Sequence, residues 1–323
     1  MKLQTKIPIF SKEPKIDYNS KIVLLGSCFV ENIGDKLNYL KFQTLQNPFG
    51  ILFHPIAIEN VIGRALKNDF YTEEDVFYKS DRWYCFEIHS SINAENKDDF
   101  IALINSKLIQ LKEYLLISTH IVLTFGTAWA YRFNNTQKLV ANCFKIPQKE
   151  FEKELLSVNE ISNSLSNIIS IVKKYNPNTA IIATVSPVRH LKDGFVENSQ
   201  SKAHLITAVQ QLMSKYSNTQ VHSYFPSYEM MMDELRDYRF YKEDMIHPNK
   251  LAISIIWEAF KKTWISSDTE LLQKEILAIQ SGLKHKPFNP KSEEYLLFLK
   301  GLEAKINSVK KAINSVIKSY EHG

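Results

Sequence analysis

Short apolar runs alternate with longer amphipathic segments over most of the chain. Four strand candidates rich in β-branched residues are 22–25 (IVLL), 120–125 (HIVLTF), 179–185 (TAIIATV) and, more weakly, 219–223 (TQVHS). Continuous runs of this kind are typical of strands buried on both faces of a sheet. Segments with helical spacing lie between them, at about 31–40, 55–67, 98–117, 157–175 and 199–217.

This alternation predicts a three-layer α/β fold with a parallel sheet. In open parallel sheets, ligands bind at the carboxyl ends of the strands. The residues that follow positions 25, 125 and 185 are therefore the places where we expect functional side chains.

The pattern changes after Trp264, where strand candidates end and heptad spacing begins. Two helical segments separated by Pro287 and Pro290 predict a helical hairpin that packs on itself or on the main domain. The alternative is a coiled coil that forms a homo-oligomer. We expect a main domain at 1–266 and a helical extension at 267–323. The heptad positions are Leu272, Ile276, Ile279 and Leu283, then Leu299, Leu302, Ile306, Val309, Ile313, Val316 and Tyr320.

Composition excludes several classes of protein. The 323 residues include only nine glycines, and the sequence contains neither a dinucleotide-binding G-x-G-x-x-G nor a P-loop. No apolar run reaches the roughly 18 residues of a membrane helix. Forty basic and 35 acidic residues give a net charge of +5 without a basic cluster, so we expect neither nucleic acid nor a membrane as partner. Three scattered cysteines form no metal motif, and the N-terminus has no signal-peptide pattern, which favours a cytoplasmic protein without a cofactor.

The first strand candidate ends in Gly26-Ser27 and a helix follows at once. A serine at such a junction is well placed as a nucleophile, because amides at the helix N-terminus stabilise an oxyanion. The alternative is that Ser27 merely caps the helix, since serine is a preferred N-cap residue. The neighbouring Cys28 could also serve as the nucleophile, although free cysteines are more often small buried apolar residues.

A serine nucleophile needs a general base, and the base needs a carboxylate that orients it. Among the nine histidines, only His247 has a carboxylate three residues earlier, Asp244. In a turn, this spacing lets the carboxylate reach Nδ1 and direct Nε2 toward a nucleophile. The alternative is a surface aspartate that caps the following helix.

Several ordered segments together resemble one family. GSCFV at 26–30 resembles the signature of the GSCFA family, which belongs to the SGNH/GDSL superfamily of hydrolases. The resemblance extends over roughly residues 1–265 and implies a flavodoxin-like α/β/α SGNH hydrolase fold. Further matching segments are NPFGILFHP (47–55), TFGTAWAY (124–131), VANCFK (140–145), SPVRH (186–190) and YFPSYEMMMDELRDYRFYKEDMIHPN (224–249).

The resemblance implies a triad of Ser27 as nucleophile, Asp244 and His247. It also implies an oxyanion hole built from the Ser27 and Gly50 amides and an asparagine side chain. The segment that should hold this asparagine reads Gly126-Thr127-Ala128, and Ala128 has no side-chain donor. The candidates for the missing bond are Thr127, Asn47 and Asn142.

Other polar residues follow the third strand candidate. Arg189 and His190 are candidate substrate-binding residues, because arginine recognises carboxylate or phosphate in a planar geometry. The alternative for Arg189 is a structural ion pair. His54 and His89 lack partners at metal-ligand spacing, and the family's usual histidine at position 144 is Phe144.

The sequence therefore predicts a metal-independent serine esterase that acts on a small acyl ester, for example an O-acetylated carbohydrate. One alternative is an acyltransferase that uses the same triad. Another is a ligand-binding module with little turnover, which Ala128 favours.

Overall fold

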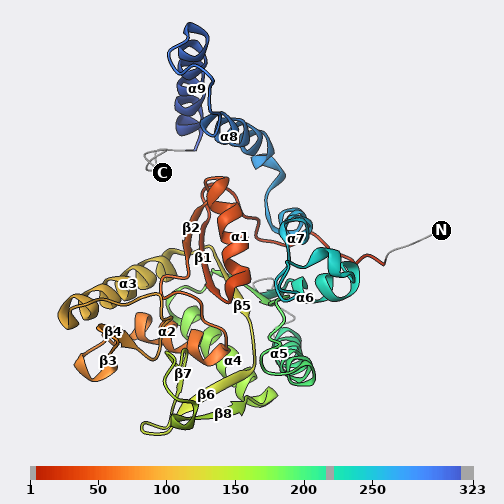
Figure 1. Cartoon of the computed structure of the whole chain (residues 1–323). Helices are drawn as coiled ribbons and strands as arrows, with labels where there is room; N and C mark the ends of the chain where they lie inside the picture. Colours follow the sequence, from red (N-terminus) through yellow and green to blue (C-terminus); the bar gives the residue numbers. More distant parts are fainter. Residues whose placement is uncertain (1–4, 216–221, 314–323) are drawn as a thin grey trace.

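The computed structural model describes residues 5–215 and 222–313 of the chain (Figure 1). Within these residues the central sheet has five parallel strands in the order β10-β9-β5-β1-β2. If these five strands are counted 1 to 5 along the chain and read from the β2 edge, their order is 2-1-3-4-5. This is the flavodoxin-like arrangement. The strands are β1 (Lys21–Gly26), β2 (Gln43–Gln46), β5 (His120–Phe125), β9 (Ala180–Val185) and β10 (His222–Tyr224).

The three inner strands bury both of their faces, as the continuous apolar runs predict. In β1, Val23 and Leu25 join one buried cluster, whereas Ile22 and Leu24 join the other. Successive side chains of a strand point to opposite faces, so a strand between two layers of helices must be apolar throughout.

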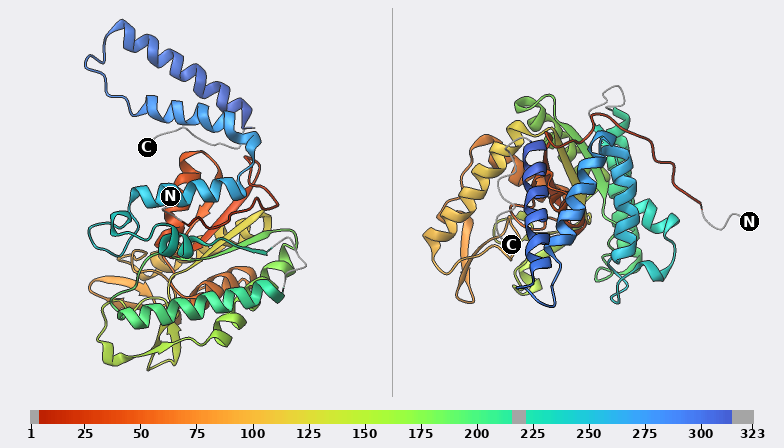
Figure 2. Two further views of the ribbon diagram at one scale, coloured as in Figure 1. Left: turned by 90° about the vertical axis from the view of Figure 1, so that its right-hand side faces the viewer. Right: turned by 90° about the horizontal axis from the view of Figure 1, so that it is seen from above.

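Helices cover both faces of the sheet and confirm the three-layer α/β fold (Figures 1 and 2). One face packs against α1 (Cys28–Tyr39) and α7 (Lys250–Trp264). The other packs against α2 (Pro55–Lys67), α3 (Lys97–Ile117), α4 (Val158–Tyr175) and α5 (Phe195–Lys215).

Several elements beyond the sheet have no counterpart in the apolar pattern of the sequence. They comprise an antiparallel hairpin between α2 and α3, a three-stranded antiparallel sheet between β5 and α4, and six short helical segments. Their bounds are β3 (Val76–Lys79), β4 (Arg82–Cys85), β6 (Trp129–Phe133), β7 (Lys138–Val140), β8 (Phe151–Leu155), η1 (Glu73–Asp75), η2 (Gln148–Glu150), α6 (Ser227–Glu229), η3 (Met230–Glu234), η4 (Tyr238–Phe240) and η5 (Ser267–Thr269).

Two C-terminal helices, α8 (Glu270–Leu283) and α9 (Glu293–Ala312), form the predicted hairpin beyond the end of α1 (Figure 2). Gln280 donates a hydrogen bond to the Tyr39 carbonyl oxygen at the C-terminus of α1, at 3.2 Å. Buried heptad positions of both helices, such as Ile276 and Val309, belong to the same apolar cluster as α1 and α7. The heptad positions Val316 and Tyr320, and residues 219–221 of the fourth strand candidate, lie outside the described residues.

Among the described helices, none is long and apolar enough to cross a membrane.

Candidate functional site

Ser27 lies where β1 meets α1, at the carboxyl edge of the sheet. It occupies the N-cap position of α1, but its side chain makes no capping hydrogen bond. The residue is fully buried, and within the described part of the chain Ser27 Oγ has no hydrogen-bond partner. A buried hydroxyl without a partner is unusual, because burying a polar group without a hydrogen bond costs free energy. Helix capping therefore does not explain this serine.

The backbone before Ser27 requires a glycine. Gly26 has a φ of +135°, and a Cβ at this position would lie 2.1 Å from the Thr124 carbonyl oxygen of the neighbouring strand β5. The Gly26 N–H donates to Asn47 Oδ1 at 2.9 Å, and Asn47 Nδ2 reaches Glu31 at 3.3 Å. Asn47 thus fixes the end of β1, and both polar atoms of its side chain form hydrogen bonds within the protein.

Asp244 and His247 form a hydrogen-bonded pair in the loop before α7. Asp244 Oδ2 lies 2.7 Å from His247 Nδ1. Asp244 Oδ1 accepts the backbone N–H groups of Ile246 and His247, each at 2.9 Å. These backbone hydrogen bonds, together with the His247 side chain, lower the pKa of Asp244 to about 2. An ionised carboxylate at Nδ1 leaves Nε2 of His247 as the free ring nitrogen.

Arg189 connects the loop after β9 to the loop that carries Asp244 and His247. Its backbone N–H donates to the Ile246 carbonyl oxygen at 3.2 Å, and its guanidinium donates to the Met245 carbonyl oxygen at 3.1 Å. The guanidinium also lies over the Tyr241 ring, 5.5 Å from its centroid. Arg189 therefore holds the histidine loop through carbonyl oxygens rather than through the structural carboxylate that we considered.

His190 lies near Ser27, because a Cβ built on Gly126 would be 3.3 Å from His190 Nε2 and 3.2 Å from Ser27 Cβ. Its Nε2 atom is buried and has no hydrogen-bond partner among the residues described. Burial, Lys202 and His247 lower the pKa of His190 to about 3, so its ring is neutral at physiological pH.

Lys202, on α5, is a site residue that the sequence does not reveal. It is 1% exposed, and its Nζ donates to the carbonyl oxygens of Gly126 at 2.6 Å and Ser186 at 2.8 Å. These carbonyls directly follow β5 and β9. Burial lowers the pKa of Lys202 to about 7. In the sequence it resembles any polar position of an amphipathic helix, so no local signal could have identified it.

The backbone donors expected in the oxyanion hole are engaged within the protein. The Ser27 N–H donates to the Thr124 carbonyl oxygen at 3.0 Å, and the Gly50 N–H donates to the Asn47 carbonyl oxygen at 2.8 Å. The Thr127 N–H donates to the Phe53 carbonyl oxygen at 3.2 Å. An oxyanion would have to compete with these carbonyls for the same N–H groups.

The side chains of Thr127 and Ala128 are also engaged within the protein. Thr127 Oγ1 lies 3.0 Å from Ser201 Oγ and accepts the Trp129 N–H at 3.0 Å. Ala128 is fully buried in the apolar core, and its N–H donates to Ser201 Oγ at 2.7 Å. Ala128 therefore packs in the apolar core, at the position where the family pattern has an asparagine as side-chain hydrogen-bond donor.

Other candidates have local structural contacts. Asn142 Oδ1 accepts the backbone N–H of Phe144 at 2.8 Å in the loop after β7. His54 caps α2 by accepting the Ala57 N–H at 3.2 Å. Burial and then Glu31 raise the pKa of the Cys28 thiol, which disfavours the thiolate and makes Cys28 a weak nucleophile.

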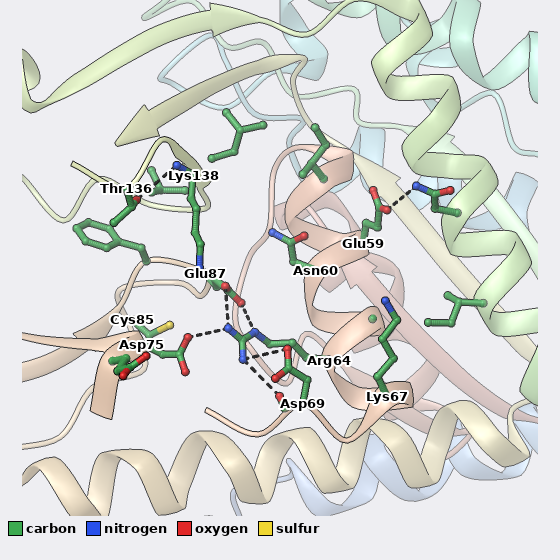
Figure 3. Close-up of a pocket in the computed structure, with 18 of the residues that line it drawn as sticks. Glu59, Asn60, Arg64, Lys67, Asp69, Asp75, Cys85, Glu87, Thr136 and Lys138 are labelled. Atoms are coloured by element: carbon green, nitrogen blue, oxygen red, sulfur yellow. Dashed lines mark hydrogen bonds and ion pairs between the residues drawn. The ribbon is translucent and has the colours of Figure 1, made fainter. Parts of the chain in front are cut away.

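A large cavity lies elsewhere, between α2, α4, β4 and β7 (Figure 3). Its volume is about 960 Å³, and none of the residues predicted for the site lines it. Figure 3 shows Arg64 among three carboxylates, with Asp75 and Glu87 each 2.7 Å away and Asp69 at 3.4 Å. The pairs with Asp75 and Glu87, which flank the β3–β4 hairpin, attach that hairpin to α2. Among the described residues, no group of three or more histidine, cysteine or acidic side chains is arranged to hold a metal ion.

Fold and site define a flavodoxin-like α/β protein with a buried serine at the end of its first strand and an Asp–His pair near its last domain helix. The chain belongs to the GSCFA family, whose model matches residues 21–260. Residues 276–319 match a second model, described as the C-terminal domain of GSCFA domain proteins.

Similarity to solved structures is distant. A Streptococcus pneumonia protein with the provisional description platelet activating factor has 12% sequence identity and a TM-score of 0.38, over 75% of this chain and 82% of that chain. An acetyl xylan esterase from the rumen bacterium Butyrivibrio proteoclasticus has 11% identity and a TM-score of 0.32, over 69% and 57% of the two chains. No curated protein matches this chain.

Proposed function

We propose that this protein is a serine esterase that acts on small acyl esters such as O-acetylated carbohydrates. The observation that supports the proposal is the buried, unpartnered hydroxyl of Ser27 at the carboxyl edge of the sheet, close to His190 Nε2 and to the Gly126 carbonyl oxygen that Lys202 binds. Membership of the GSCFA family supports it, because that family resembles the SGNH hydrolases.

In this proposal, Ser27 Oγ attacks the ester carbonyl and His247 Nε2 accepts its proton. The ionised Asp244 holds His247 through Nδ1 and stabilises the imidazolium that forms. The leaving alcohol takes this proton, and water then releases the acyl group from Ser27 by the same steps in reverse. An alcohol acceptor in place of water would make the enzyme an acyltransferase.

A fluorophosphonate probe tests the nucleophile. We expect covalent labelling of the wild-type protein, no labelling of Ser27→Ala, and unchanged labelling of the adjacent control Cys28→Ala. Turnover of p-nitrophenyl acetate and acetylated sugars should disappear with the labelling. Equal labelling of Ser27→Ala and wild type would exclude Ser27 as the nucleophile.

The engaged backbone donors favour a second candidate, a binding module on a hydrolase scaffold. In this structure the amides of Ser27, Gly50 and Thr127 all bind carbonyl oxygens. A binding module predicts saturable binding of an acylated sugar without turnover and without probe labelling. Product analysis with and without an added alcohol separates hydrolysis from acyl transfer.

A further inference from the structure

The strongest clue beyond the triad is a pair of buried polar atoms on one side of Gly126. A Cβ built on Gly126 would lie 3.2 Å from Ser27 Cβ and 3.3 Å from His190 Nε2. The serine side chain and the imidazole nitrogen therefore approach the same point. Ser27 Oγ and His190 Nε2 are both buried, and neither has a hydrogen-bond partner in the described part of the chain.

The His190 imidazole is attached to rigid parts of the site. Its backbone N–H donates to Asn198 Oδ1 on α5 at 2.8 Å. Its ring packs edge-on against Phe53, with 5.5 Å between the ring centroids. The Phe53 carbonyl oxygen in turn accepts the Gly126 N–H at 2.8 Å. Contacts on both sides thus fix the position of Nε2 relative to Gly126 and Ser27.

The charge state of His190 suits a donor that keeps its proton. Burial is the main cause of its low pKa, and the nearby Lys202 and His247 lower it further. A neutral imidazole carries one N–H donor and one acceptor nitrogen. A neutral histidine with a depressed pKa can polarise a carbonyl oxygen without becoming a charged acid.

We propose that Nε2–H of His190 donates a hydrogen bond to the oxyanion and replaces the side-chain donor that Ala128 lacks. The inference rests on Ser27 being the nucleophile of the proposed esterase. When Ser27 Oγ bonds to the carbonyl carbon, the π electrons of the C=O bond move to the carbonyl oxygen. The serine proton moves to His247 Nε2, while His190 keeps its own proton. When the C=O bond re-forms, the alcohol leaves with the proton from His247.

A pair of variants separates donation by His190 from packing. His190→Phe keeps a ring against Phe53 but has no donor. His190→Gln places an amide nitrogen the same number of bonds from Cα as Nε2. With p-nitrophenyl acetate, we expect kcat of His190→Phe to fall about 10²–10³-fold with KM changed little, the cost typical of one lost oxyanion donor. His190→Gln should stay within about tenfold of wild type.

Binding of a boronic acid that forms a tetrahedral adduct on Ser27 provides a second readout. His190→Phe should weaken this binding by about the same factor as kcat/KM. In wild type, imidazole ¹⁵N NMR should show His190 as the neutral Nε2–H tautomer, with the Nε2–H proton shifted downfield in the adduct. This measurement does not require the variants to fold.

The outcomes are distinct. Three results would overturn the role of His190 and leave the proposed esterase intact. They are equal kcat values for His190→Phe and His190→Gln, an Nδ1–H tautomer of His190, and an Nε2–H resonance that the adduct does not change. If the fluorophosphonate fails to label wild-type Ser27, the esterase proposal and the role of His190 are both contradicted.

Discussion

At the level of single residues, surroundings set the chemistry of each candidate group. Asp244 is exposed, yet backbone N–H groups and His247 keep its pKa at about 2. His190 is buried, and its pKa is held at about 3. Both groups keep a single charge state from about pH 4 to pH 9. A loss of activity on acidification within that range would come from a different group.

Replacing Asp244 tests its role in orienting His247. In Asp244→Asn, a side-chain N–H₂ group can face His247 Nδ1 and favour the tautomer that carries its proton on Nε2, which cannot act as a base. We expect kcat to fall by about 10²–10⁴-fold with a normally folded protein. Steady-state kinetics with p-nitrophenyl acetate measures the change.

Asp233→Asn is the matched control for Asp244→Asn. Asp233 is also an exposed carboxylate, and it lies shortly before Asp244 in the sequence. Unlike Asp244, it pairs with Arg236, at 2.6 Å. This variant should keep wild-type kinetics, because exposed ion pairs contribute little. Similar rates for both variants would show that the carboxylate of Asp244 does not act through His247.

At the level of elements, the site depends on how the ends of β5 and β9 are held together. Lys202 on α5 binds the carbonyls that follow both strands, and Arg189 joins the loop after β9 to the histidine loop. Loops are the mobile parts of most proteins, and such cross-links keep their functional groups in place.

Lys202 should make stability depend on pH. Its pKa is about 7 in the folded protein, against about 10.4 in an unfolded chain. Between these values the unfolded chain binds more protons, so the free energy of unfolding rises as the pH increases from about 7 to about 10. In Lys202→Met this contribution is absent, so the free energy of unfolding of the wild type should rise relative to that of the variant over the same window. Urea unfolding at several pH values measures it.

Lys173→Met is the control for Lys202→Met. Lys173 also binds two carbonyl oxygens, those of Pro177 and Thr179 at 2.8 and 2.6 Å, but it is only half-buried. Its removal should change the pH dependence less than that of Lys202. Parallel stability profiles for wild type and Lys202→Met would contradict a lysine with a depressed pKa at this position.

At the level of the whole molecule, the hairpin and the candidate site lie at opposite ends of α1. Ser27 precedes the first residue of this helix, whereas Gln280 of α8 and Lys284, directly after α8, contact Tyr39 at its last residue. Twelve helical residues span about 18 Å. We therefore expect the described part of the hairpin to affect the stability of the fold rather than the chemistry around Ser27.

Leu302→Ala separates stability from activity. Leu302 is 7% exposed and belongs to the apolar cluster that joins α8 and α9 to α1 and α7. We expect the variant to lose about 2–4 kcal/mol of unfolding free energy. Its kcat/KM should stay unchanged below the unfolding transition.

Leu297→Ala, at a site on the same helix that is 72% exposed, should change stability by no more than about 0.5 kcal/mol. Because the apolar cluster is continuous, we also expect the hairpin and the main domain to unfold in one transition. A separate transition of the hairpin at lower temperature would disprove this coupling.

The sequence was sufficient for the sheet core and the main helices because their signals are local. The run at 120–125 coincides with β5, and the segment at 55–67 coincides with α2. The strand β2 escaped prediction because QTLQ has a mostly polar, half-buried pattern at the edge of the sheet. The antiparallel strands were not predicted for the same reason, since partly exposed strands lack a continuous apolar run.

For the candidate site, some residues could be predicted from the sequence and others only from the structure. Ser27, Asp244 and His247 could be proposed as candidates from the sequence because a strand–serine–helix junction and a short Asp–His spacing are local patterns. Lys202 was not found, because burial of a helical lysine against two loop carbonyls arises only when α5 packs beside β5 and β9. Likewise, only the fold places His190 Nε2 and Ser27 on the same side of Gly126.

By itself, the sequence determined the α/β architecture, the family and the candidate residues for the proposed acyl chemistry, because apolar periodicity and short motifs act over a few residues. Tertiary structure decided which polar groups are buried, which amides are already bonded and which side chains meet at Ser27. Those properties depend on contacts between segments that are distant along the chain. Burial and long-range contacts, rather than residue identity, then set the pKa values of His190 and Lys202.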